Sequence, residues 1–86
     1  HKGLAKFFKF GSTAGIQANH AKKLRLILGR LNVAHTIKDM DLPGLRLHQL
    51  SGNRSMEWSV TVSGNWRVTF LFIEGHAENV NYEDYH

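Results

Sequence analysis

The pattern of hydrophobic and polar residues changes period about halfway along the chain. In the first half, apolar residues recur three and four positions apart, which places them on one face of an α-helix. Leu4, Phe7 and Phe8 follow this spacing in "KGLAKFFKF", and Gly11 is suited to end that helix. After a linker, "STAGIQ", the run "NHAKKLRLILGRLNVA" has the same spacing, and Asn19 is expected to cap its N-terminus. The pattern therefore predicts two helices, and the apolar stripe of the second consists of Leu24, Ile27, Leu28 and Leu31.

In the second half, apolar and polar residues alternate, as they do in strands with one buried face. The change follows a predicted loop, "TIKDMDLPG", which contains the single proline. Four alternating segments come next, "LRLHQL", "MEWSVTV", "WRVTFLFI" and a weaker "HAENVNY", and glycine-bearing turns separate them. Such strands predict an antiparallel meander. Two helices before four strands predict an α+β fold, with the helices packed on one face of a twisted sheet in a single domain, residues 1–86.

Aromatic residues dominate one face of the predicted middle strands. Such a stripe either belongs to the core or forms a platform on which nucleic-acid bases stack. Ribonucleoprotein-type sheets combine aromatic residues with basic residues on neighbouring strands, and this sequence lacks that combination. We therefore expect the stripe to lie in the core. It consists of Trp58, Trp66, Phe70 and Phe72.

Composition narrows the class of protein further. Without cysteine, the chain has no disulfide, thiolate nucleophile or thiolate metal site, which suits a reducing cytoplasm. The six histidines form no i, i+4 pair and no H-E-x-x-H run, so we expect neither a metal nor another cofactor. No apolar run has the length of a membrane helix and no secretory signal is recognisable. We therefore expect a cytoplasmic protein that does not bind a membrane.

Charge is distributed unevenly along the chain. The net charge is +4, but residues 1–54 hold 10 of the 11 Lys and Arg residues and 2 of the 7 Asp and Glu residues, a balance of +8. Residues 55–86 hold 1 and 5, a balance of −4, and their single basic residue is Arg67. The basic first half permits a polyanionic partner. The basic residues of the second helix form either a solvated face or a surface for phosphates or a partner protein. These residues are Lys22, Lys23, Arg25 and Arg30.

Several side chains between residues 46 and 86 have the chemistry that RNA cleavage requires. Cleavage needs a base for the 2′-hydroxyl, an acid for the 5′ leaving oxygen, and positive charge for the phosphate. Histidine can carry the proton, arginine can hold phosphate oxygens, and tyrosine can stack on a base. From spacing alone, a structural interpretation stays open: a strand arginine can be a surface residue, His48 a structural imidazole, and the tyrosines near the end can simply close the sheet edge. The candidates are Arg46, His48, Arg54, Arg67, Asp84, Tyr85 and His86.

Residues 45–86 resemble the C-terminal half of HigB toxins, in the RelE/ParE superfamily of bacterial type II toxin–antitoxin systems. The resemblance rests on "LHxLxG", "WSVTVSGNWRVTF" and the closing "YEDYH", which are specific in this order although each is weak alone. The first residues, "HKGLAKFF", resemble the family's opening segment. The resemblance implies a small RelE-like fold, in which the family's first strand would lie before His1.

The resemblance also implies an activity and partners. Members of the family are toxins that enter the ribosomal A site and cleave messenger RNA there, which inhibits translation. A HigA-type antitoxin with a helix-turn-helix neutralises them, and we expect a heterotetramer of two toxins and two antitoxins. Through the antitoxin, the complex binds operator DNA and represses its own operon.

By position, the resemblance assigns roles to individual residues. His86 is expected to carry a proton with His48 as its partner, and Arg67 to stabilise the phosphate. Tyr85 is expected to position a base. The catalytic set implied is His48, Arg67, Asp84, Tyr85 and His86. Residues expected to contact RNA or the ribosome are Arg46, Arg54, Lys22, Lys23, Arg25 and Arg30.

The sequence departs from the family at two positions. Ser51 stands where well-studied relatives have a lysine, and Ser63 where some have an arginine. Two positive groups near the substrate phosphates are therefore missing, which is worth about a few kcal/mol of charge stabilisation in a dry site. Weak or differently targeted cleavage is one alternative that this leaves open. The others are a gyrase-targeting toxin of the ParE branch, and an attenuated toxin that acts mainly as a co-repressor with its antitoxin.

Overall fold

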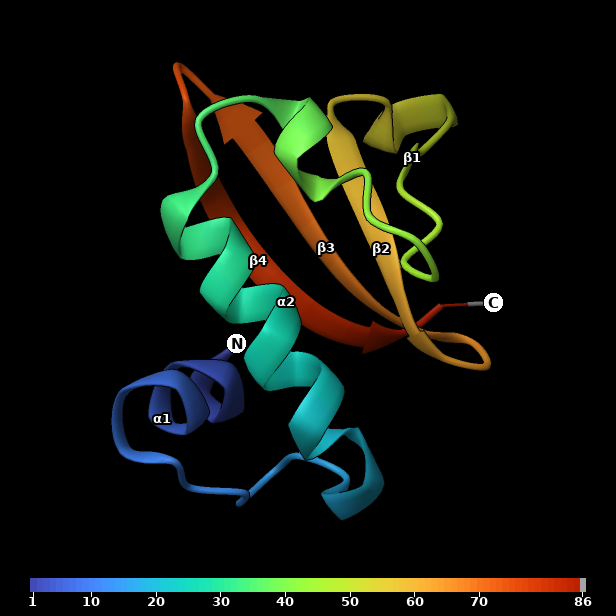
Figure 1. Cartoon of the computed structure of the whole chain (residues 1–86). Helices are drawn as coiled ribbons and strands as arrows, with labels where there is room; N and C mark the ends of the chain where they lie inside the picture. The colour runs from blue at the N-terminus through green and yellow to red at the C-terminus, as the bar shows by residue number, and fades with distance from the viewer. Residues whose placement is uncertain (86) are drawn as a thin grey trace.

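The computed structural model describes residues 1–85 and confirms the α+β prediction. Two helices precede an antiparallel sheet whose four strands lie in the order β1-β2-β3-β4 (Figure 1). None of the helices in residues 1–85 is long and apolar enough to span a bilayer. The helices and strands are α1 (Lys2–Phe10), α2 (Ala21–Val33), β1 (His48–Gln49), β2 (Glu57–Ser63), β3 (Trp66–Ile73) and β4 (His76–Asp84). Three 3-10 turns connect them, η1 (Ala18–His20), η2 (Ile37–Met40) and η3 (Gly52–Arg54).

Helix α1 has the bounds that its caps predict. At its start, the imidazole Nδ1 of His1 accepts a hydrogen bond from the N–H of Leu4 at 3.1 Å. At its end, Gly11 adopts a left-handed conformation (φ 71°) and its N–H donates to the carbonyl of Phe7. Leu4 and Phe7 are buried as predicted. Phe8, which the spacing places on the same face, is 51% exposed.

Helix α2 is not capped as the sequence suggested. It begins at Ala21 after the turn η1, and the prediction that Asn19 is its N-cap is wrong. His20 occupies the cap position but makes no side-chain cap hydrogen bond. The reason is tertiary: the imidazole of His20 is 3% exposed and its Nδ1 lies 2.6 Å from the hydroxyl of Tyr82 on β4.

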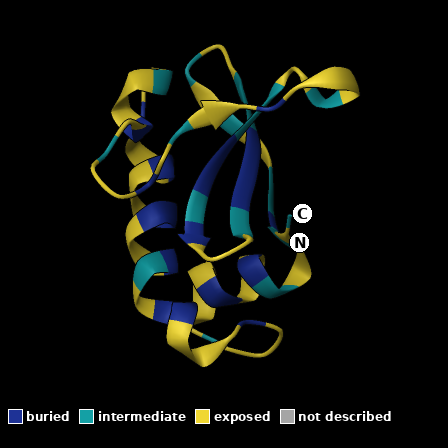
Figure 2. Ribbon diagram, turned by 90° about the vertical axis from the view of Figure 1, so that its right-hand side faces the viewer, coloured by how far each residue is buried: buried dark blue, intermediate teal, exposed yellow. Residues whose placement is uncertain are grey.

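The core lies between the two helices and one face of the sheet. Figure 2 shows the buried residues of α2 on the side of the helix that is turned toward the strands. The register aligns Val60, Val68 and Tyr82 across β2, β3 and β4, and Phe70 beside them is completely buried. The predicted aromatic stripe therefore does belong to the core. Its other members, Trp58, Trp66 and Phe72, are partly buried and pack against it.

The segment between α2 and β2 differs most from the prediction. The predicted loop at 36–44 contains the turn η2, whose capping box joins Thr36 and Asp39 and which buries Met40 completely. The predicted strand "LRLHQL" is reduced to His48–Gln49. Arg46 has a φ of 50°, outside the extended region, so the pleat cannot continue through it.

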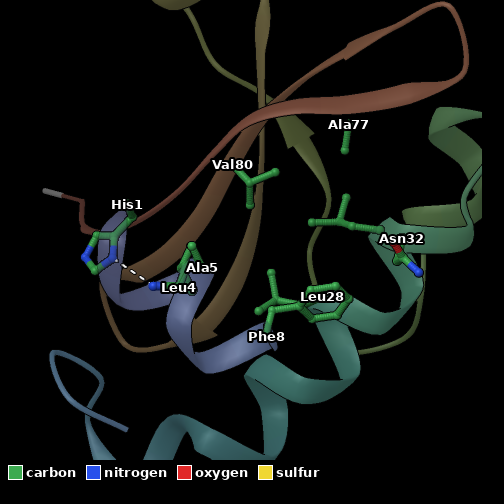
Figure 3. A pocket seen from close by; sticks show the side chains of 9 residues that line it. His1, Leu4, Ala5, Phe8, Leu28, Asn32, Ala77 and Val80 are labelled. Atoms are coloured by element: carbon green, nitrogen blue, oxygen red, sulfur yellow. Dashed lines mark hydrogen bonds between the residues drawn. The ribbon is translucent and has the colours of Figure 1, made fainter. Parts of the chain in front are cut away.

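The fourth strand was predicted to be the weakest, yet β4 is the longest, with nine residues. Its pairing with β3 extends from Ile73 opposite His76 to Trp66 opposite Asp84. Beside β4, an apolar groove of about 310 Å³ lies between β4 and the two helices (Figure 3). The groove is on the helix side of the sheet, and its lining includes Leu4, Phe8 and Val80.

Candidate functional site

The candidate site lies on the face of the sheet that is turned away from the helices, here called the outer face. Strand pairing places His48, Ser59 and Thr69 in one row across β1, β2 and β3. The next row places Arg67 of β3 beside Glu83 of β4. Because paired residues share a face of an antiparallel sheet, the meander brings together side chains that are far apart in the sequence.

His48 presents an imidazole at the edge of this face. It is exposed, and its Nδ1 lies 3.2 Å from the backbone carbonyl of Arg46. A carbonyl can only accept, so this contact requires the proton on Nδ1. The neutral ring then has Nε2 available as a proton acceptor. The unusual backbone at Arg46, which shortens β1, therefore also orients the imidazole.

Arg67 is held by the turn between β2 and β3. Its Nη1 donates to the carbonyl of Gly64 at 2.6 Å and to that of Trp66 at 3.2 Å. Its Nε is buried and has no hydrogen-bond partner within residues 1–85. A buried donor without a partner costs about 1–3 kcal/mol, which a bound anion or a water would offset. Arg67 thus combines a fixed orientation with an unused donor.

A second arginine on the outer face is already paired with carboxylates. Arg54 donates to Glu57 from Nε (2.8 Å) and Nη2 (2.9 Å), and to Glu83 from Nη1 (2.7 Å) and Nη2 (3.2 Å). We call this group, Arg54 with Glu57 and Glu83, the Arg54 clamp. Hydrogen bonds from Arg54 lower the pKa of both carboxyl groups, and the carboxylates raise the pKa of the guanidinium.

The clamp explains why part of the outer face is closed. The polar residues of the middle strands were predicted to lie opposite the core, yet Ser59 is 1% exposed and Thr69 is fully buried. The hydroxyl of Thr69 donates to Glu83 at 3.3 Å, and the amide of Asn81 donates to the same carboxylate at 3.1 Å. Carboxylate and guanidinium therefore cover the centre of this face.

The C-terminal segment continues from β4 onto the same face. The N–H of Tyr85 donates to the carbonyl of Asn65 at 2.7 Å. The Tyr85 ring lies 5.7 Å from the guanidinium carbon of Arg54, a cation–π distance. Asp84 is exposed and pairs with Trp66 in the register. The predicted role of His86 falls on a residue outside the described ones.

The structure gathers some of the predicted site residues and separates others. His48, Arg54, Arg67 and Tyr85 share the outer face. Ser51 and Ser63 are both exposed, but Ser51 precedes η3 beside the start of β2 and Ser63 is at the other end of that strand. The basic residues of α2 belong to the helix layer on the other side of the sheet: Lys22, Lys23, Arg25 and Arg30. Among these, Lys23 donates to the carbonyl of Gly44 at 3.4 Å and Arg25 lies over the Phe7 ring at 5.4 Å.

Two functional-site neighbours were missed from the sequence. Glu57 and Glu83 were not predicted as site residues, because an isolated carboxylate in a strand belongs to no recognisable sequence motif. One signal was available, since Glu57 follows Arg54 by three residues. For Glu83 the signal was its spacing from Tyr85. Side chains two residues apart in a strand point to the same face, so Glu83 and Tyr85 were expected to lie on one face.

The structure is an α+β domain, in which two helices cover one face of an antiparallel sheet and the other face holds an imidazole, a guanidinium and a phenol. Residues 1–86 match the family described as "RelE-like toxin of type II toxin-antitoxin system HigB", and the chain belongs to this family of HigB-like toxins. The chain is 42% identical over 86 residues to endoribonuclease HigB of Proteus vulgaris, covering 100% of this chain and 94% of that protein. A toxin of a type II system implies an antitoxin partner.

Proposed function

We propose that this toxin is an endoribonuclease that cleaves messenger RNA in the ribosomal A site and thereby inhibits translation. The observation that carries the proposal is the shared position of His48, Arg67 and Tyr85 on the outer face. The name of the 42% identical relative, endoribonuclease HigB, supports the same activity. Ribosome dependence and the A site rest on the family resemblance of "LHxLxG", "NWR" and "YEDYH".

The reaction follows from the chemistry of these groups. A base removes the proton of a 2′-hydroxyl, the 2′-oxygen attacks the adjacent phosphorus, and the 5′-oxygen leaves after protonation by an acid. We assign the proton transfers to His86 and His48, with Nε2 of His48 free to act. Arg67 stabilises the charge that develops on the phosphate oxygens, and Tyr85 holds a base by stacking. Asp84 belongs to the same segment. These residues supply acid, base and positive charge, so the proposal includes no metal ion.

The two serines qualify the strength of this activity. Ser51 and Ser63 are exposed, and they carry no charge at two positions where the family resemblance leads us to expect a positive one. We therefore propose slower cleavage than in relatives that have both basic residues. Ser51→Lys should raise the cleavage rate, with Ser55→Lys, also exposed on the neighbouring turn, as the matched control. If Ser51→Lys creates cleavage where the natural chain shows none, the attenuated toxin acting as co-repressor is the better description.

The partners follow from the type of system. We propose a HigA-type antitoxin with a helix-turn-helix, in a complex of two toxins and two antitoxins that binds operator DNA, and a cytoplasmic site of action on ribosomes. The basic residues of α2 lie on the opposite side of the sheet from the outer face. We therefore propose that they contact ribosomal RNA or the antitoxin and not the scissile phosphate. They are Lys22, Lys23, Arg25 and Arg30.

The decisive experiment maps messenger RNA 5′ ends in cells after induction of the toxin. We expect new ends within codons for the natural chain, and their loss in His86→Ala and His48→Gln. Arg67→Ala should lower the rate about 10²- to 10³-fold, as removal of an oxyanion donor does. His76→Gln serves as control because His76 is an exposed histidine at the start of β4. Undiminished cleavage in His86→Ala contradicts the proposed role of the tail. Inhibition of gyrase supercoiling without new ends would identify a ParE-type activity instead.

A further inference from the structure

Arg54 has its hydrogen-bonding edges occupied before any substrate is present. Four hydrogen bonds of 2.7–3.2 Å join its Nε, Nη1 and Nη2 to the two carboxylates of the Arg54 clamp. An arginine that binds phosphate uses this same planar fork. With one positive and two negative groups, the clamp also has a net charge of −1, which disfavours the approach of a phosphate. Arg54 is therefore poorly placed to be a phosphate ligand.

The clamp connects parts of the fold that do not pair directly. Glu57 begins β2 and Glu83 lies near the end of β4, with β3 between these strands. Arg54, at the end of η3, bridges them across Thr69 of β3. The guanidinium then lies 5.7 Å from the ring centre of Tyr85, two residues after Glu83. Arg54 therefore connects the turn after β1, the outer face of the sheet and Tyr85.

We propose that Arg54 is a positioning residue, which holds the ring of Tyr85 against the outer face instead of binding RNA phosphate. This inference deepens the proposed function, since Tyr85 belongs to the proposed active site. The carboxylates fix the guanidinium, and the guanidinium fixes the ring. Replacing Arg54 therefore changes the geometry of the site and leaves the charge contacts with RNA intact.

The test separates a rate effect from a binding effect. For the natural chain and Arg54→Ala, we would measure the single-turnover cleavage rate on programmed ribosomes and the affinity for them at several salt concentrations. We expect a rate lower by about 10²-fold, the cost of displacing a reacting group by about 1 Å. We expect only a small loss of affinity, caused by the two carboxylates that are left without their guanidinium. The slope of log affinity against log salt stays the same. A fall in affinity with a slope smaller by about one marks a lost phosphate contact and overturns the proposal.

Conservative variants sharpen the distinction. Arg54→Lys keeps the charge but loses the fork, so we expect it to be as slow as Arg54→Ala. Glu83→Gln removes a negative charge from the site, which would speed a reaction limited by phosphate binding. We expect it to slow cleavage, because it weakens the clamp. A full rate in Arg54→Lys, or faster cleavage by Glu83→Gln, contradicts the proposal.

A double variant tests whether Arg54 acts through Tyr85. If it does, Arg54→Ala combined with Tyr85→Ala cleaves about as slowly as Tyr85→Ala alone. Independent losses multiply instead and contradict the mechanism. Thr36→Ala, which destabilises the remote turn η2, is the control for loss of stability, and we expect its cleavage rate to be unchanged.

Failure of the proposed function can be recognised separately. If the natural chain cleaves no RNA, the endoribonuclease assignment fails. The clamp is still tested by urea unfolding of the natural chain, Arg54→Ala, Tyr85→Ala and the double variant. The stability losses of Arg54→Ala and Tyr85→Ala should then be non-additive in the double variant. Strict additivity shows that the guanidinium does not hold the ring, and the inference is then wrong whatever the activity.

Discussion

The contact between His20 and Tyr82 allows a quantitative prediction about stability. His20 is 3% exposed and Tyr82 is 4% exposed, and the imidazole Nδ1 lies 2.6 Å from the phenol oxygen. This hydrogen bond joins the start of α2 to β4, two elements whose residues are 62 positions apart. The substitution Tyr82→Phe removes one oxygen and keeps the ring, so the stacking of that ring on Trp66, at 4.6 Å between centroids, stays in place.

The expected cost follows from the imidazole that is left behind. Loss of one partner leaves a buried polar group unpaired, which costs about 1–3 kcal/mol. Burial raises the pKa of Tyr82, so the phenol that is lost is neutral at the pH of the assay. We therefore expect the free energy of unfolding to fall by about 2 kcal/mol. For a chain of this size that corresponds to a melting temperature lower by about 10 °C.

The assay is urea unfolding followed by tryptophan fluorescence and circular dichroism at neutral pH. Tyr85→Phe is the matched control, because it removes a hydroxyl from a half-buried ring three residues further along. We expect the control to change stability by less than about 0.5 kcal/mol. Equal stability of Tyr82→Phe and the natural chain would falsify the view that this hydrogen bond anchors α2 to the sheet.

Three further predictions concern the core, the clamp and the turn η2. Phe70→Ala creates a cavity in the centre of the core and should cost about 4 kcal/mol in urea unfolding, and a cost below about 2 kcal/mol contradicts the packing described. Arg54 lowers the pKa of Glu57 and Glu83 below their ordinary value of 4.5, so their stabilisation is present above that pH and is lost as the pH falls through the lower folded values. Urea midpoints measured from pH 6 to pH 3 should therefore decline, and the decline should be shallower in Glu83→Gln. Thr36→Ala removes a capping box and should lower stability by about 1 kcal/mol, whereas an unchanged midpoint shows that the box contributes nothing.

Local patterns were sufficient for most of the architecture. The spacing of Leu4 and Phe7, together with Gly11, gave the first helix with its bounds, because cap and face depend on neighbours within a few residues. The turns "SGN" and "EG" gave the meander, since two strands joined by a short turn pair with each other. Motif resemblance then pointed to His48, Arg67 and Tyr85 as candidates, and the strand pairing of the structure places them on one face.

What the local patterns missed depends on partners far away in the chain. Asn19 is a good cap by residue type, but burial of His20 against Tyr82 set the start of α2 elsewhere. By residue type, Arg54 was a reasonable phosphate ligand. Only the fold showed that its guanidinium donates a hydrogen bond to Glu83, 29 residues away.

The length of a strand also depends on distant partners. The segment "HAENVNY" has weak alternation, yet β4 is the longest strand because β3 supplies hydrogen bonds along its length. Helix faces and turns are therefore determined by the sequence alone, because their energies come from adjacent residues. Charge pairing, burial of polar groups and strand length are decided by tertiary structure, since their energies depend on which distant groups the fold brings within a few ångströms.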